Sequence, residues 1–148
     1  LGLQGNTAYT DGMPYGLCTA GSSVYVAAGN LWKVEGGAVT LIPVADAHAL
    51  YALCVCEGTV YAAGQTNGKA AVWKIEGINA SLHKKLSTSG GVYALCAAGG
   101  DLYVAGTVYD GGLYKPVWWH IAADGTLTEN KLGTAEGEAL GICLAAQE

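Results

Sequence analysis

Hydrophobic and polar residues alternate in short segments along the whole chain. In "YALCVCEGTVYAAG", residues 51–64, two apolar runs flank the polar pair Glu57-Gly58. Runs of this length, bounded by Gly, Asn, Asp or Ser, predict short β-strands joined by tight turns. No segment shows the 3.6-residue period of a helix, and Val, Tyr, Trp, Thr and Ile recur as strands prefer. The pattern predicts an all-β protein.

The pattern is also repeated, and the same phrase occurs four times, the last time in part. The copies are "YGLCTAGSSVYVAAG" from Tyr15, "YALCVCEGTVYAAG" from Tyr51, "YALCAAGGDLYVAG" from Tyr93 and "LGICLAAQE" from Leu140. A second phrase follows each full copy, and its aligned residues are Trp32, Trp73 and Trp119, each followed by Lys33, Lys74 or His120.

Each repeat predicts four antiparallel strands. The shared cysteines, at positions 18, 54, 96 and 143, are 36, 42 and 47 residues apart. Four strands in a repeat of this length are typical of a β-propeller blade. We expect three complete blades at 15–50, 51–91 and 92–139. Residues 1–14 would carry the outer strand of a preceding blade, at 3–9, and residues 140–148 the inner strand of a further one, at 140–146.

The phrase "VYVAGTVYDGG…WW" resembles the repeats of uncharacterised bacterial β-propellers, common in gut Bacteroidetes, whose blades read roughly "VYVAG…YWKNG". The resemblance covers about 130 residues and includes Tyr25, Tyr61, Tyr103, Gly29, Gly64, Gly106 and the three aligned tryptophans. This chain departs from the family in its repeated cysteine and in "WKVEG" and "WKIEG" in place of "WKNG". The resemblance implies the propeller fold more than an activity.

The five cysteines favour a structural role. In the first strand of each repeat, a small face such as Ala52 and Cys54 alternates with a large face such as Leu53 and Val55, so neighbouring blades can interdigitate. A free cysteine there is a small hydrophobe, and we expect reduced, buried thiols. Cys54 and Cys56 form a C-x-C pair that can bind a soft metal, but no second pair accompanies it. We expect no metal and no cofactor.

Composition narrows the function classes. The chain has 148 residues, 51% of them hydrophobic and 13% charged, which fits one folded domain. Its net charge of −5 argues against nucleic acid as a partner. No apolar run reaches the roughly 18 residues of a membrane helix, so we expect no membrane partner. No signal peptide is visible, free cysteines fit the cytoplasm, and the family resemblance allows export, so the compartment stays open.

Few residues suggest chemistry, and we expect no catalytic residue. No Ser-His-Asp spacing, carboxylate pair or phosphate loop is present. His48 lies in "ADAHA", a connection that would line one mouth of the ring, where it could act with Asp46. His83 is expected to face solvent, and His120 occupies a lysine position.

The longest insertion is "TVYDGGLYKP", residues 107–116, expected as a loop at the same mouth. It can contact a sugar, peptide or protein, or it can be a longer hairpin whose tyrosines cover the blade edge. The candidate ligand-binding residues are therefore His48, Tyr109, Asp110 and Tyr114. The aligned tryptophans are expected to pack between blades rather than to bind ligand.

Two functional classes follow. The first is a non-catalytic binding or scaffolding propeller with a protein, peptide or glycan ligand, and the alternative is a hydrolase or lyase at the ring mouth that uses His48 with an acidic partner. Propellers close with about four to eight blades, so three blades cannot form a ring. Either the chain belongs to a longer propeller, or copies associate, and we expect a homodimer.

Overall fold

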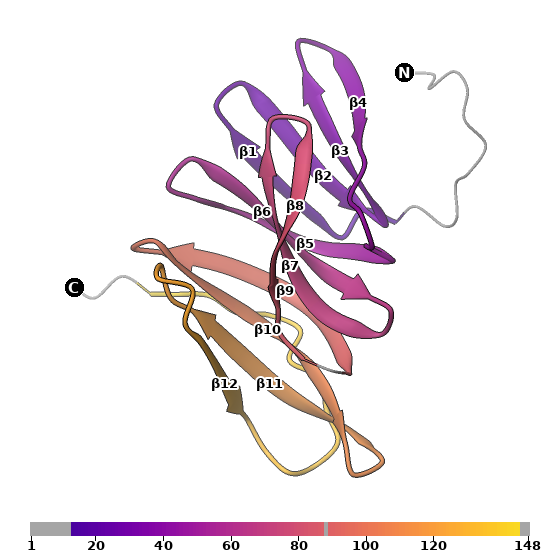
Figure 1. The fold of residues 1–148 in the computed structure, drawn as a ribbon, viewed down its shortest axis with the longest axis vertical. Helices are drawn as coiled ribbons and strands as arrows, with labels where there is room; N and C mark the ends of the chain where they lie inside the picture. The colour runs from indigo at the N-terminus through magenta and orange to yellow at the C-terminus, as the bar shows by residue number, and fades with distance from the viewer. Residues whose placement is uncertain (1–12, 88, 146–148) are drawn as a thin grey trace.

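Twelve β-strands and no helix form among the described residues, 13–87 and 89–145, of this computed structural model. They make three four-stranded antiparallel sheets, each from four consecutive strands (Figure 1). The first sheet contains β1 Gly16–Ala20, β2 Ser23–Ala28, β3 Asn30–Glu35 and β4 Ala38–Ile42. The second contains β5 Ala49–Cys56, β6 Thr59–Thr66, β7 Lys69–Glu76 and β8 Asn79–Lys85. The third contains β9 Gly90–Ala98, β10 Asp101–Asp110, β11 Leu113–Ile121 and β12 Leu127–Lys131. The all-β prediction is confirmed.

Tight turns keep each unit in sequence order. The turns at 57–58, 67–68 and 111–112 each consist of two residues with positive φ, as in Glu57 (48°) and Gly58 (79°). Two positive φ values match the right-handed twist of the flanking strands, and Gly and Asn tolerate them best. The polar pairs between the apolar runs therefore form the turns that the sequence pattern predicts.

A β-bulge interrupts the first strand of the second and third sheets. The bulged residue, Tyr51 in β5 and Tyr93 in β9, has no partner in the ladder. On the neighbouring strand, Gly64 and Gly106 lie at these bulges, and a Cβ there would overlap the carbonyl oxygen of Ala49 or Gly91. The bulges explain why each "VYxAG" phrase in these sheets ends in glycine.

The sheets pack face to face, and their first strands lie side by side, β1 against β5 and β5 against β9. One core cluster joins the first sheet to the second around Leu31, Leu53 and Trp73. The other joins the second sheet to the third around Val72 and Trp119. Trp73 and Trp119 are 1% and 0% exposed, so these two aligned tryptophans pack between sheets, as predicted. The third, Trp32, is half-buried and faces away from the second sheet, so the prediction does not hold for it within one chain.

Two sheet faces lie outside this stack. On the first sheet, Leu17, Val39 and Leu41 are 65%, 41% and 48% exposed. On the third sheet, the outer face carries Tyr103 and Trp118, and residues 139–144 lie against it. Leu31 and Val72, which are fully buried, occupy the position of Trp118 in the other two sheets.

The sequence also predicts one strand near each end of the chain, at 3–9 and at 140–146. The predicted strand at 3–9 lies outside the described residues. Residues 140–145 pair with no strand among the described residues and so belong to no sheet, although an inner strand is expected there. A ladder requires a second strand, and none of the twelve provides it.

Candidate functional site

The residues that the sequence predicts at a ring mouth lie at one end of the sheets, where the second strand of a sheet turns into the third. The connection before β5 reaches the β6–β7 hairpin, where the His48 N–H donates to the carbonyl of Gln65 (2.8 Å). The connection before β9 reaches the β10–β11 hairpin, where the Ser89 hydroxyl donates to the carbonyl of Tyr109 (3.1 Å). The candidate residues therefore share an edge but come from two sheets.

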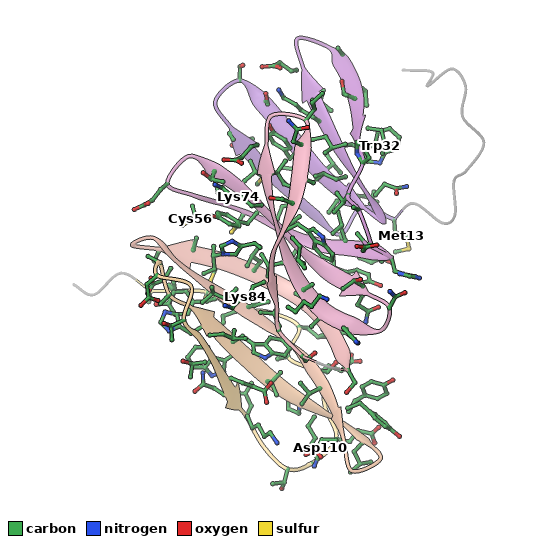
Figure 2. All side chains as sticks on the ribbon, in the orientation of Figure 1. Met13, Trp32, Cys56, Lys74, Lys84 and Asp110 are labelled. Atoms are coloured by element: carbon green, nitrogen blue, oxygen red, sulfur yellow. The ribbon has the colours of Figure 1, made fainter. Side chains whose placement is uncertain are left out.

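Residues 107–116 are a hairpin and not a loop. β10 and β11 continue in register to the pair Asp110 and Leu113, and Gly111 and Gly112 make the turn. This hairpin projects beyond the rest of the third sheet, with Asp110 near its tip (Figure 2). A Gly-Gly turn accommodates the insertion by extending both strands, so the alternative of a longer hairpin is the one observed.

Tyr109 and Tyr114 face each other across this hairpin. Their ring centroids are 5.1 Å apart with planes tilted by 57°, and each side chain is 50% exposed. Two rigid aromatic side chains on a short turn offer a large contact area at low entropic cost, as protein-binding and sugar-binding surfaces require.

The carboxylate of Asp110 is paired with two lysine side chains. Lys115 Nζ lies 3.0 Å and Lys131 Nζ 3.4 Å from its Oδ2. The hydrogen bond from Lys115, followed by the charges of both lysines, lowers the pKa of this carboxyl. Successive strand residues point to opposite faces, so Asp110 lies on the face opposite Tyr109 and Tyr114. The structure therefore separates this carboxylate from the tyrosine pair.

His48 is exposed, and its ring binds the backbone. Its Nδ1 accepts a hydrogen bond from the Asn67 N–H (3.3 Å). Of the described residues, neither Asp46 nor the tyrosine pair makes a hydrogen bond with this ring. The acid–base pair that a hydrolase or lyase would need at His48 is not assembled.

A row of tyrosines at the beginning of the first strands has no counterpart in the sequence prediction. The Tyr15 and Tyr51 rings are 5.2 Å apart edge-on, and the Tyr51 and Tyr93 rings are 6.3 Å apart and tilted. The Tyr93 hydroxyl then donates to Glu138 Oε1 (3.3 Å). Tyr51 and Tyr93 lie at bulges, which re-aim side chains, and Tyr15 directly precedes β1. The tyrosine that opens each repeat is the sequence signal for this row.

A second unpredicted arrangement is a histidine–carboxylate pair. His120 Nε2 lies 2.8 Å from Asp101 Oδ2, and its ring stacks on Tyr103 at 4.9 Å. The hydrogen bond with His120 and a second one from the Ala123 N–H lower the pKa of Asp101. In the other sheets the aligned Lys33 and Lys74 instead pair with glutamates two residues on. The sequence signal for this pair is Asp101, which takes the position that Ser23 and Thr59 hold in the other two repeats.

The cysteines are free but less buried than predicted. Cys56 is buried, Cys18, Cys54 and Cys96 are half-buried, and Cys143 is exposed. Cys18, Cys54, Cys56 and Cys96 lie in β1, β5 and β9, which are edge strands of their sheets, so one side of each strand has no neighbouring strand in its sheet. Burial raises the pKa of Cys18 to about 11 and that of Cys54 to about 12, which disfavours the thiolate that a metal or an electrophile needs.

Residues 13–87 and 89–145 contain no group of three or more His, Cys, Asp or Glu side chains placed to hold a metal ion. The same residues include no helix long and apolar enough to cross a membrane.

Comparisons with known proteins give information on the fold but none on the function. No protein family model matches the chain, and no curated protein sequence matches it. A chain in the crystal structure of a nidogen/laminin complex is similar, with a TM-score of 0.59 and 17% identity over 87% of this chain and 51% of that one. This chain thus spans about half the length of that neighbour. The computationally designed Ika4 protein is similar with a TM-score of 0.47 and 17% identity, over 89% of this chain and 96% of that one.

Proposed function

We propose that this chain is a non-catalytic binding or scaffolding module of the β-propeller type, whose ring is completed when copies of the chain associate. Three features support the propeller proposal: repeated four-stranded sheets, face-to-face packing of consecutive sheets, and first strands that lie side by side. The resemblance of its repeats to those of bacterial propellers points in the same direction.

The exposed tyrosine pair at the edge carries the binding proposal. Tyr109 and Tyr114 are half exposed at the tip of the longest hairpin, and neither is needed to fill a core cluster. Aromatic rings at such a tip stack on the apolar face of a sugar or enter a pocket of a protein or peptide. By contrast, no carboxylate of residues 13–87 or 89–145 pairs with His48, so the geometry of these residues does not favour the hydrolase or lyase alternative.

Self-association is supported by the two outer faces. Both internal interfaces bury one face of a sheet against the opposite face of the next. The first sheet retains the face that this arrangement would use next, and Leu17 and Leu41 show its apolar character. At the other end of the stack, residues 139–144 lie against the outer face of the third sheet. A contact between these two ends of different copies, made twice, closes by two-fold symmetry.

Glycan and peptide arrays test the binding proposal. We expect selective binding to one ligand class, weakened at least tenfold by the double variant Tyr109→Ala/Tyr114→Ala, since these rings carry the contact. Ile78→Ala, a change at a 59% exposed residue in another turn, is the matched control. Equal binding by the double variant would overturn the site. Turnover of a hydrolase or lyase substrate that is lost in His48→Ala would overturn the non-catalytic assignment.

A further inference from the structure

Residues 139–145 lie against the outer face of the third sheet as β5 lies against the Leu31 face of the first sheet. The Leu50 N–H, at the start of β5, donates to the carbonyl of Gly29 (3.1 Å). The Ala139 N–H donates in the same way to the carbonyl of Gly106 (3.4 Å). Gly29 and Gly106 each close a second-strand phrase, with Gly29 one register position later than Gly106, and Leu50 and Ala139 both lie four residues before the repeated cysteine. Residues 139–145 therefore lie next to the third sheet much as β5 lies next to the first.

Packing supports this equivalence. Ile142, Cys143 and Leu144 lie with Tyr103 and Trp118 around a cavity of about 320 Å³. Figure 1 shows this yellow segment passing along the third sheet. The segment is thus held at one face, as β5 and β9 are held by the preceding sheets.

The backbone of this segment differs from that of the other first strands. Each of β1, β5 and β9 pairs with the strand that follows it, whereas residues 140–145 make no backbone hydrogen bond with any described residue. Leu140 and Leu144 are 65% and 45% exposed. An apolar segment with a free row of N–H and C=O groups is a template for an added strand.

The repeats also define which strand would fit. In all three sheets the repeated cysteine pairs with a tyrosine, at Cys18–Tyr25, Cys54–Tyr61 and Cys96–Tyr103. The residue before the cysteine pairs with Val or Ala. By the same register, Cys143 would lie opposite a tyrosine and Ile142 opposite a small or β-branched residue.

We propose that residues 140–145 form an acceptor site for an antiparallel strand of the pattern Val-Tyr-x-Ala, supplied by a further repeat of this type. The inference rests on the propeller-type stacking of the proposed function and adds to it the strand that would continue the stack. Because β2, β6 and β10 are each paired on both edges, that strand comes from a repeat other than the three described ones. Main-chain hydrogen bonds supply the affinity, and the Tyr opposite Cys143 sets the register.

A synthetic hairpin peptide that reproduces residues 59–76 tests the site by fluorescence anisotropy. It contains the "TVYAAG" strand with its own β7 partner, so the strand arrives preformed. We expect saturable binding to the full chain, weakened at least tenfold in Gly141→Pro/Ile142→Pro, because proline removes N–H donors from the edge. Gly133→Pro is the control for a proline in the same connection, outside the site.

Register is tested by cross-linking. A peptide with cysteine at the position of Tyr61 should form a mixed disulfide with Cys143 under a glutathione redox buffer, in which oxidised glutathione takes up the two electrons. A peptide with cysteine one position earlier, on the opposite face, should react several-fold more slowly. If copies already occupy the segment, the peptide must displace them and lower the mean mass in light scattering.

A peptide that neither binds nor changes the mass overturns the inference, as does binding that survives the proline double variant. Equal cross-linking by both peptides would refute the register. These failures leave the array result for the Tyr109 and Tyr114 variants untouched, so they are distinguishable from failure of the proposed function.

Discussion

At the scale of single residues, the repeats reflect backbone geometry as much as side-chain packing. Glycine closes the second-strand phrase in all three sheets, but at two register positions and for two reasons. Gly29 has a φ of 72° and lies one residue beyond Ala28, which is the register counterpart of Gly64 and Gly106, whereas Gly64 and Gly106 face a bulge in the neighbouring strand. The first strand of the first sheet has no bulge, so alanine fits there at the position where the other two sheets need glycine.

Alanine at Gly64 or Gly106 should destabilise the fold. The new Cβ would overlap the carbonyl oxygen of Ala49 or Gly91, and the backbone can yield only by disturbing the bulge. We expect a loss of about 1–3 kcal/mol in the free energy of unfolding from urea titrations, as for overpacked cores. Gly133→Ala, with no atom within 4 Å of the added Cβ, should change it by less than about 0.5 kcal/mol. Equal midpoints for all three variants would contradict the steric explanation.

The cysteines should react in the order of their exposure and pKa. With a pKa of about 12 instead of 9.0, Cys54 has roughly a thousandfold less thiolate at pH 8 than an unperturbed thiol. Iodoacetamide at pH 8, followed by peptide mass spectrometry, should modify Cys143 first and Cys54 and Cys18 far more slowly. In urea all five should react alike. Native labelling of Cys54 as fast as that of Cys143 would show that burial does not control this thiol.

At the scale of strands and hairpins, the sequence predicts much of the fold, because each apolar run and its turn are adjacent in the chain. The alignment of Trp32, Trp73 and Trp119 matches equivalent third-strand positions. The bulges at Tyr51 and Tyr93 were not predicted, since a bulge arises from how two strands meet and not from either strand alone. For the same reason, the His120–Asp101 pair, which joins β11 to the start of β10, was missed.

The β10–β11 hairpin depends on its two glycines. Gly111 and Gly112 have φ values of 62° and 86°, which side chains other than those of Asn and Asp adopt at a cost of about 1–2 kcal/mol per residue. Gly111→Ala/Gly112→Ala should therefore fray the tip and speed hydrogen exchange of the amides at 108–115. Gly111→Asn should not, because Asn67 occupies the same position in the β6–β7 turn with a φ of 49°. Unchanged exchange in the alanine variant would mean that the turn tolerates other geometries.

At the scale of the whole molecule, the sheets form a stack with an apolar face at each end. The internal interfaces bury the large residues Trp73 and Trp119, and the outer face of the first sheet carries the equivalent Trp32 with the exposed Leu17 and Leu41. Exposed apolar patches on a folded protein mark sites of association. The position of Trp118, where the other sheets have Leu31 and Val72, gives the third sheet a bulkier outer face than those buried inside the stack.

Light scattering should therefore give about twice the chain mass of 15.0 kDa. Leu17→Lys, on the outer face of the first sheet, should restore the monomer, because a charge at the centre of an apolar contact loses its hydration without a partner. Since Leu17 is 65% exposed in the single chain, the same change should leave the folded chain itself nearly as stable. Ile78→Lys, at a 59% exposed turn residue between β7 and β8, is the matched control and should stay dimeric. Removal of residues 140–148 should also weaken the dimer, because residues 141–144 form part of the end of the stack that the contact would use. A wild-type monomer that unfolds cooperatively would contradict the self-association proposal. A dimer that persists in both Leu17→Lys and the truncated chain would contradict it as well.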